Sequence, residues 1–429
     1  MKVGLYESDI TPPLGCYQSG YGFDRKAEEV YTKLYSKALV IEQDGEYAVV
    51  ISVDICEYPT EMNDIVAKRI YDYTGITPDR ICIHSTHDHC GAPVTDDPAI
   101  ECYRDDPYTD VFYRLVADSA ILAFKRLEEC EIKFAKAIVP DTARSRCYLL
   151  KDGTRKTHES NPDLIERPLS YSDNEVPILF IEKNGKKLGA LYTFGCHQDT
   201  VGLRPFGYCG DYSSIVSEHL KDQYGRDFVS IYLAAPSGDM TTVNVFAKIP
   251  EEKVVRFREV GRRIAKGIKS VENDTTVLDG KLKVVKEKIE VAKRKLTKEQ
   301  YYDYVKWLID NDGGEFRISN AVHYQSADHT DTAELYLQIF AIGDFALYVY
   351  PGEMFNEYTL RTKKNSPFKF NMVAENSNGY GGYIPTPDAF DEKSVLYEIS
   401  LAYDSFLVPE AGDMLCDKII DMAKNMKNS

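Results

Sequence analysis

The sequence predicts an α/β fold, with α+β as the alternative class, in which mixed β-sheets are flanked by helices. Short apolar runs rich in β-branched residues alternate with longer segments of helical periodicity over most of the chain. No internal repeat and no linker rich in Pro, Ser or Gly divides the chain. Because 429 residues with 43% hydrophobic side chains can bury a large core, we expect one large catalytic domain over residues 1–429.

The elements of the first half begin with a continuous apolar run over residues 46–54, which predicts a buried strand. Thr60 is placed to cap a helix that Gly75 ends, because glycine readily adopts the left-handed conformation after a helix. A strand over 80–86, a helix over 108–130, a strand over 131–139 and a hairpin over 176–194 follow. The hairpin is predicted around Asn184-Gly185, the dipeptide that a two-residue turn favours.

The second half continues the alternation of helices and strands. It predicts a helix over 213–225, a strand over 227–235, a helix over 251–273, a strand over 278–294, a helix over 297–311, a hairpin over 333–350 around Gly343-Asp344, a strand over 369–374 and a helix over 409–426. Loops are expected near 94–107, 149–175 and 312–331. The loop over 149–175 is a candidate lid.

Charge and hydropathy exclude several classes of function. The net charge of 52 − 68 = −16 repels phosphate backbones and argues against nucleic-acid binding. No run approaches 18 apolar residues, so no transmembrane segment is predicted. Glu7 and Asp9 interrupt the N-terminus before a signal peptide could form, and the ten cysteines contain no C-x-x-C pair. We therefore expect a cytoplasmic protein with reduced thiols; the sequence leaves its oligomeric state open.

Polar side chains of catalytic type follow the predicted strands at their carboxyl ends. Loops beyond these ends form the ligand crevice of α/β sheets, since the strands hold them side by side. His87 and His89 follow the strand over 80–86. Further along the chain, the corresponding positions hold His197, Asp239, Glu353, Tyr380 and Tyr383. We expect these loops to converge on one pocket.

His87 and His89 provide the most specific indication of a metal site. In an extended segment, residues i and i+2 point to the same side, so both imidazoles can address one point. With His197 and Glu353 the sequence offers three histidines and one carboxylate, and two histidines with one carboxylate suit a hydrolytic zinc site. The alternatives are two exposed loop histidines, and a Glu353 that merely neighbours a helix N-terminus. His84, inside its strand, is interpreted as a hydrogen-bonded core residue.

Seven segments, in order along the chain, resemble motifs of the neutral (non-lysosomal) ceramidase family of zinc amidases. Any one of them is weak evidence, whereas seven in the same order are specific. A Gly-Tyr pair at 20–21, which the family also has, follows the first segment. The segments are V-G-L-Y-E-S-D-I-T-P-P (3–13), S-T-H-D-H-C-G-A-P (85–93), A-R-S-R-C-Y-L (143–149), G-C-H-Q-D-T (195–200), G-D-M-T-T-V-N (238–244), I-G-D-F-A-L-Y-V-Y-P-G-E (342–353) and N-G-Y-G-G-Y-I-P-T-P-D-A-F (378–390).

The resemblance implies a set of roles for individual residues. Zinc would be held by His87, His197, Glu353 and Tyr383, while His89 would face the substrate and donate a proton to the leaving amine. Arg144 and Tyr397 would line the scissile amide, which a metal-activated water attacks, and zinc, Tyr383 or Arg144 would stabilise the developing oxyanion. We also consider four aspartates as groups that orient the imidazoles: Asp88, Asp199, Asp211 and Asp239.

Departures from the family pattern bear on the substrate. Thr241 and Thr242 replace a Ser-Pro pair, with one residue added before Asn244, and neither the leader nor the C-terminal β-sandwich domain of the family is expected. The predicted function is therefore zinc-dependent hydrolysis of a linear amide, either ceramide-like, as in sphingolipid metabolism, or another N-acyl compound. The alternatives are an ester or small polar amide as substrate, and a non-catalytic protein that binds a small molecule.

Overall fold

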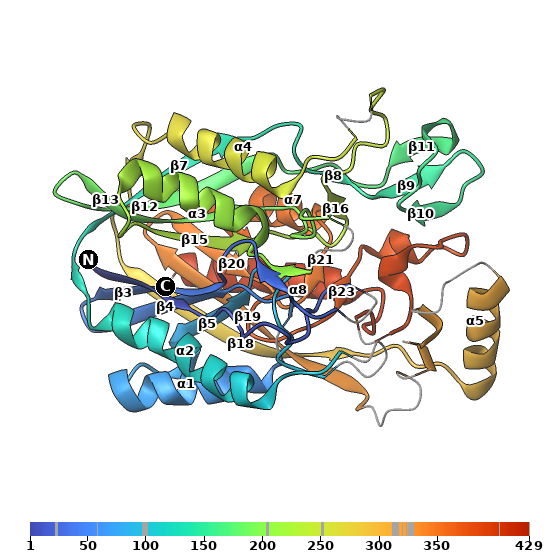
Figure 1. Cartoon of the computed structure of the whole chain (residues 1–429), viewed down its shortest axis with the longest axis horizontal. Coiled ribbons are helices and arrows are strands. Elements are labelled where there is room, and N and C mark those ends of the chain that lie inside the picture. The colour runs from blue at the N-terminus through green and yellow to red at the C-terminus, as the bar shows by residue number, and fades with distance from the viewer. Residues whose placement is uncertain are drawn as a thin grey trace.

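Three β-sheets, each covered on its outer side by a pair of helices, surround a shared apolar core (Figure 1). The computed structural model describes residues 1–429 except 22–24, 58, 97–101, 203–205, 250–252, 311–316, 320, 323, 325–329, 403 and 429. The α/β class predicted from the sequence is confirmed, with sheets that mix parallel and antiparallel pairs.

The first sheet has the strand order β5-β4-β3-β1-β6. Its strands are β1 (Lys2–Asp9), β3 (Tyr35–Gln43), β4 (Glu46–Val53), β5 (Ile81–Ser85) and β6 (Glu128–Glu129). Helices α1 (Glu61–Thr74) and α2 (Asp106–Phe124) pack on its outer face, where Ile70 and Phe112 belong to the same buried cluster as Val49 of β4. As predicted, α1 ends at Gly75, which adopts the left-handed conformation with φ = 76°.

The second sheet has the order β15-β13-β12-β7-β17. It comprises β7 (Glu131–Ile138), β12 (Glu175–Lys183), β13 (Lys186–Phe194), β15 (Val229–Ala234) and β17 (Thr276–Val277), covered by α3 (Asp211–Tyr224) and α4 (Phe257–Ser270). The predicted hairpin between β12 and β13 is confirmed. Asn184 and Gly185 both have positive φ, as a turn of type I′ requires.

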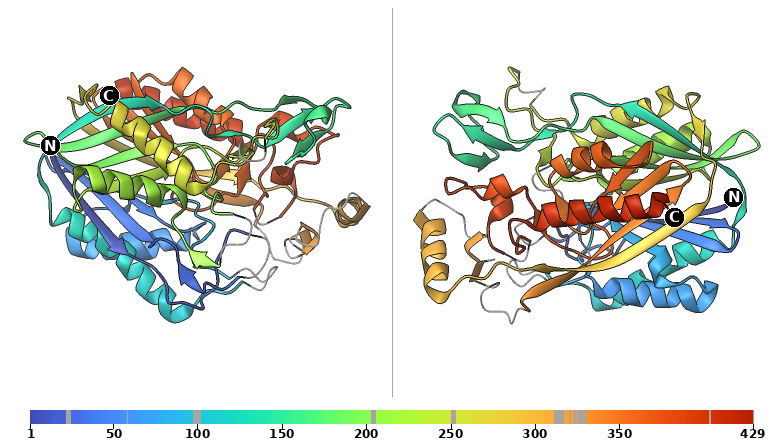
Figure 2. Two further views of the ribbon diagram at one scale, coloured as in Figure 1. Left: turned by 45° about the horizontal axis from the view of Figure 1, so that its top comes forward. Right: turned by 180° about the vertical axis from the view of Figure 1, so that it is seen from behind.

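The third sheet has the order β18-β19-β20-β22 and lies on the face seen in the right-hand view of Figure 2. Its strands are β18 (Leu282–Ala292), β19 (Thr332–Ile342), β20 (Phe345–Val349) and β22 (Phe370–Ala374), covered by α7 (Glu357–Asn365) and α8 (Ala411–Asn428). The predicted hairpin around Gly343-Asp344 joins β19 to β20. Helix α5 (Lys298–Asp310) lies apart from the sheets at one end of the molecule (Figure 1).

The inner faces of the three sheets meet in one apolar cluster. Leu39 and Val50 come from the first sheet, Leu191 from the second, and Leu347 and Met372 from the third. Strands with a core on one face and helices on the other are buried on both sides, which explains their continuous apolar runs. Burial of both faces is therefore what made these strands recognisable in the sequence.

The carboxyl ends of three pairs of parallel strands lie close together and bring the functional loops to one place. Each large sheet contains one such pair, β4–β5, β13–β15 and β20–β22, and their carboxyl ends are joined across sheets by backbone hydrogen bonds. Glu375 N donates to Ala234 O at 2.8 Å, and Asn378 N donates to Ile83 O at 2.8 Å. His84 adds a buried link: its Nδ1 lies 2.8 Å from Glu375 O, and its Nε2 accepts from the Ala234 N–H. The structural interpretation of His84 is confirmed.

Three expectations of local structure were wrong. The helix predicted over 108–130 ends at Phe124, because the chain turns and residues 128–129 pair with β1. The helix predicted over 251–273 begins only at Phe257 and ends at Ser270 as α4, while residues 251 and 252 lie outside the described residues. Residues 149–175, expected to be a loop, contribute to a three-stranded sheet of β9 (Cys147–Leu150), β10 (Arg155–Thr157) and β11 (Ile165–Pro168). Long-range pairing and short polar strands leave no local periodic signal.

Short elements complete the described chain. Two-stranded pairs join β2 (Glu29–Val30) with β14 (Gly207–Tyr208), β8 (Arg144–Ser145) with β16 (Met240–Thr241), and β21 (Glu353–Met354) with β23 (Tyr383–Ile384). The predicted loops over 94–107 and 312–331 lie in part outside the described residues. Among the described residues, no helix has the length and apolar character needed to cross a membrane.

Candidate active site

Four buried side chains from four separate segments meet at one point. His87 Nε2 lies 3.3 Å from His197 Nε2 and 3.1 Å from Glu353 Oε2. His197 Nε2 lies 3.2 Å from Glu353 Oε2 and 3.3 Å from the Tyr383 hydroxyl. All four side chains are at most 6% exposed. The structure thus brings together the four residues proposed from the sequence as metal ligands.

The two histidines are held by backbone carbonyls through their other ring nitrogens. His87 Nδ1 lies 2.9 Å from Cys56 O, and His197 Nδ1 lies 2.9 Å from Ser237 O. A carbonyl oxygen can only accept, so each Nδ1 carries a proton, and each Nε2 of a neutral ring directs its lone pair at the shared point. His87 itself has φ = 61°, a conformation uncommon for a residue with a side chain and often found at functional sites.

Glu353 and Tyr383 are neighbours because β21 and β23 pair in parallel with these two residues in register. Gly352, just before Glu353, has φ = 84°, and a Cβ atom there would lie 2.5 Å from Gly382 O. Glycine therefore allows the two segments to approach. Tyr380 donates to Glu353 Oε1 at 2.7 Å, which leaves Oε2 facing the two imidazoles.

The donor set fits a zinc ion. Zinc binds imidazole nitrogen and carboxylate oxygen at about 2.0–2.2 Å with four or five ligands, so neighbouring donors to one ion lie about 3 Å apart and a fifth position can take water. The separations between His87, His197, Glu353 and Tyr383 agree with this spacing. Glu353 Oε2 is buried and accepts no hydrogen bond from the described residues. A cation at the shared point would satisfy this oxygen and both nitrogen lone pairs.

The electrostatics of the cluster also favour a positive charge. Burial opposes ionisation of both His87 and Glu353, but their mutual attraction outweighs it: the pKa of His87 is raised well above its usual value and that of Glu353 is lowered well below its own. A second grouping, Cys56 with His87 and His89, is less suited to a metal. Burial raises the pKa of the Cys56 thiol to about 11, which disfavours the thiolate that binds metals.

His89 borders the cluster and faces a cavity. Its Nε2 lies 3.2 Å from His87 Nε2, its Nδ1 is buried without a hydrogen-bond partner among the described residues, and the ring packs edge-on to Tyr21. Gly20, with φ = 95°, packs directly on the ring, and a Cβ atom there would lie 2.6 Å from the His89 side chain. Burial and the neighbouring histidines lower the pKa of His89 well below its usual value. The Gly20-Tyr21 pair thus shapes this side of the site.

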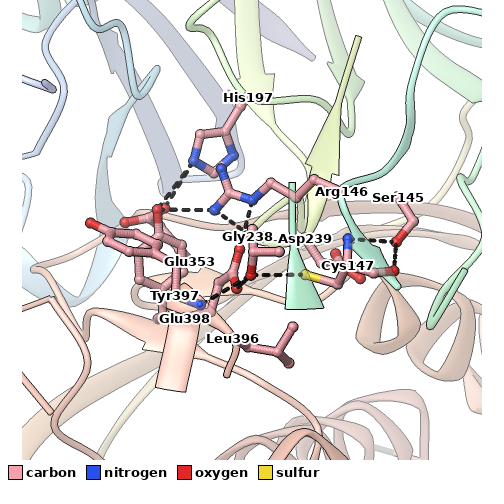
Figure 3. Close-up of polar contacts among 12 residues, drawn as sticks. Ser145, Arg146, Cys147, His197, Gly238, Asp239, Glu353, Leu396, Tyr397 and Glu398 are labelled. Carbon is pink, nitrogen blue, oxygen red and sulfur yellow. Dashed lines mark hydrogen bonds and ion pairs between the residues drawn. The ribbon is translucent and has the colours of Figure 1, made fainter. Parts of the chain in front are cut away.

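Arg146, rather than Arg144, reaches the cluster. The Arg146 Nη2 donates to Gly238 O at 2.7 Å and to the Tyr383 hydroxyl at 3.2 Å, and its Nε donates to Glu398 Oε1 at 2.7 Å (Figure 3). The Arg144 side chain is 31% exposed and contacts Asp141. The structure therefore does not bring Arg144, which the sequence analysis placed at the scissile amide, to the cluster. Arg144 and Arg146 in the A-R-S-R segment are two residues apart, so in a strand both side chains point to the same side. The sequence alone therefore could not show which of them reaches the site.

Tyr397, which the resemblance places at the scissile amide, lies beside Tyr383 in the structure. Their rings pack edge-on with centroids 5.5 Å apart, and the Tyr397 hydroxyl donates to Asp404 Oδ2 at 2.6 Å. The neighbouring Glu398, which was not predicted, is fully buried and accepts from both Arg146 and Thr157. No local pattern in the sequence indicates this carboxylate, because its partners lie far away along the chain.

The aspartates proposed to orient the imidazoles are not the groups that hydrogen-bond to them. Asp211 accepts from the Thr200 N–H and hydroxyl, and Asp239 accepts from the Asn356 N–H and the Ser170 hydroxyl. Their contacts fix the loops after β13 and β15. Asp88 Oδ1 likewise accepts from the Cys90 N–H, and Asp199 lines the cavity. Carbonyls hold the imidazoles instead, so this expectation was wrong.

A cavity of about 1090 Å³ opens onto the cluster. Its inner wall includes His89, His197, Arg146, Tyr383 and Tyr397. Thr241 and Thr242, the altered positions of the G-D-M-T-T-V-N segment, also line it. The site thus combines four metal-ligand donors, a histidine and an arginine at the wall of a space large enough for a small organic ligand.

Comparisons with known proteins agree with this geometry. A family model described as neutral/alkaline non-lysosomal ceramidase, N-terminal, matches residues 1–286. The crystal structure of neutral ceramidase from Pseudomonas aeruginosa is similar with a TM-score of 0.74 and 16% identity, over 100% of this chain and 74% of the other. A ceramidase complexed with C2 gives the same TM-score and identity, over 100% and 75%. No curated protein matches the chain.

Proposed function

Since the chain belongs to the neutral/alkaline non-lysosomal ceramidase family, we propose that it is a zinc-dependent hydrolase that cleaves the amide bond of ceramide or another N-acyl compound. The observation that carries the proposal is the meeting of two imidazoles, one carboxylate and one phenol at a single buried point beside a cavity. The neutral ceramidase whose fold the chain shares supports an amide as the bond cleaved.

His87, His197, Glu353 and Tyr383 would hold the zinc ion. A zinc ion in such a site makes water a nucleophile near neutral pH and polarises a carbonyl oxygen. The chain's own contribution is orientation, since Cys56 O and the Tyr380 hydroxyl fix the donors before the ion binds.

The remaining residues would handle the substrate and its proton. His89 borders both the cluster and the cavity, where an imidazole can take a proton from the attacking water and give it to the leaving nitrogen. Arg146 directs its guanidinium at Tyr383, so it can stabilise the negative charge that develops on the carbonyl oxygen. Tyr397 closes the wall beside Tyr383.

A substrate screen with zinc analysis tests the proposal. We expect purified protein to contain about one zinc ion per chain and to release fatty acid from a short-chain N-acylsphingosine or an N-acyl amino acid. Aryl esters, tested beside them, distinguish an esterase on the same site. Stoichiometric zinc without turnover of any amide or ester would instead favour a non-catalytic binding protein.

The two arginines of A-R-S-R provide a matched pair of variants. Arg146→Lys is expected to lower kcat/KM about 10²-fold, because lysine keeps the charge but loses the fork that spans Gly238 O and Tyr383. Arg144→Lys, at an exposed position, should leave kcat/KM within about twofold. The measurement is kcat/KM for the best amide of the screen.

Stability controls accompany this comparison, because Arg146 is the ion-pair partner of the fully buried Glu398. Thermal unfolding shows whether Arg146→Lys is folded, and the double variant Arg146→Gln/Glu398→Gln removes both buried charges together. Equal losses of activity in Arg144→Lys and Arg146→Lys would contradict the assignment of Arg146 to the reaction.

A further inference from the structure

The mouth of the cavity carries an excess of positive charge on a strongly acidic protein. The chain has a net charge of −16, yet the cavity lining includes Lys156, Arg256, Arg317 and Lys393 beyond the inner Arg146. Two carboxylates, Asp199 and Glu392, also line it. With Arg146 neutralised by Glu398 and Lys156 by Glu159, three cations face two carboxylates, an excess of 3 − 2 = +1.

Most of these cations are not neutralised by neighbours. Lys156 forms an ion pair with Glu159 at 3.0 Å. Within the part of the chain that the structure describes, Arg256, Arg317 and Lys393 form no ion pair. Arg256 and Lys393 are exposed, whereas Arg317 is half-buried and donates to Leu396 O and the Ser400 hydroxyl. Three cations from distant parts of the sequence thus retain charge at one opening.

Such an arrangement favours an anion. A cleft whose lining has an excess of one sign of charge attracts a ligand of the opposite sign, and guanidinium and ammonium groups bind carboxylate and phosphate. Ceramide carries no charge and would therefore form no ion pair with these side chains. Trp307, with the valine side chains of the lining, supplies an apolar surface in the same cavity. The lining therefore suits a molecule that has both an apolar part and an anionic part.

We propose that the amide cleaved at this centre carries an anionic group, a carboxylate or a phosphate, that binds Arg256, Arg317 and Lys393 at the cavity mouth. This inference rests on the proposed hydrolase function. It places the amide at the His89 and Arg146 end of the cavity and the anionic group toward the opening.

Two matched pairs of amides test the charge requirement. N-octanoylglycine is compared with N-octanoylglycinamide, and N-octanoyl-O-phosphoethanolamine with N-octanoylethanolamine, all below their micelle concentrations. We expect kcat/KM to be about tenfold higher for the anionic member of at least one pair, with a smaller preference at high salt. The pair with the larger ratio identifies carboxylate or phosphate as the group recognised. Equal kcat/KM values within both pairs would overturn the inference.

Charge variants locate the preference at the cavity mouth. In Arg256→Gln/Lys393→Gln, the ratio of anionic to neutral kcat/KM should fall about tenfold. The control Arg258→Gln/Lys266→Gln removes the same two charges from exposed positions of α4 outside the lining, and the ratio should stay at the wild-type value. An equal fall of the ratio in both double variants would show that net charge, rather than this site, sets the preference.

Binding to metal-stripped protein separates this inference from the proposed hydrolysis. Trp307 is the single tryptophan of the chain and lines the cavity, so its fluorescence reports occupancy without turnover. Tighter binding of N-octanoylglycine than of N-octanoylglycinamide, with no hydrolysis by the zinc-loaded protein, would support the anion site and reject the hydrolase. Hydrolysis of both amides with equal binding would support the hydrolase and reject the anion site.

Discussion

Replacing His87 with alanine is expected to remove the metal and, with it, the activity. His87 Nε2 lies within 3.3 Å of both His197 and Glu353, so its loss leaves an incomplete donor set. We expect zinc to fall from about one ion per chain to under about a tenth, and kcat/KM to fall about 10³-fold or more. Elemental analysis of purified protein and the amide assay measure the two effects, and His197→Ala should behave in the same way.

Controls separate loss of metal from loss of fold. His219→Ala removes an exposed histidine of α3 and should keep both zinc and activity. Glu353→Gln has almost the same shape as the native side chain, so it should lose zinc while the protein remains folded by circular dichroism. Stoichiometric zinc in both His87→Ala and His197→Ala would exclude this cluster as the metal site.

The His89→Gln variant is expected to keep zinc and lose turnover. His89 borders the cluster, but its place at the cavity wall assigns it to the substrate rather than the ion. Loss of a proton-transfer group costs about 10²–10⁴-fold in rate, so kcat should fall by about 10²-fold or more with little change in KM. Zinc content and steady-state kinetics on the same preparation give both quantities.

The leaving group provides a second readout for His89. An amide whose amine leaves easily, such as an anilide with a nitro group, needs less help from a proton donor. The defect of His89→Gln should therefore shrink with such a substrate. Wild-type kcat in His89→Gln, or loss of its zinc, would contradict the assignment.

Much of the fold was predictable because its signals are local. The buried strands are apolar on both faces, the hairpin at Asn184-Gly185 has the residues that its turn requires, and Gly75 ends α1. The predictions that were wrong concern residues whose structure depends on partners far away along the chain. Residues 128–129 leave the predicted helix to pair with β1, and residues 149–175 form strands stabilised by partners elsewhere in the chain.

The candidate site shows the same division. The sequence placed His87, His197, Glu353 and Tyr383 after strands, and the structure brings them together because parallel strand pairs end at one point. Other features depended on packing alone. Burial of Glu398, more than 200 residues away, draws Arg146 rather than Arg144 into the site.

The sequence by itself determined the fold class, most of the strands and helices, and the residue types that can hold a metal, because these follow from periodicity, turn residues and side-chain chemistry. Only the tertiary structure decided which arginine meets Tyr383, which carbonyls orient the imidazoles, and that cations gather at the mouth of a cavity in an acidic protein. The physical reason is distance along the chain: such contacts arise when separate segments pack together, and no local pattern encodes them.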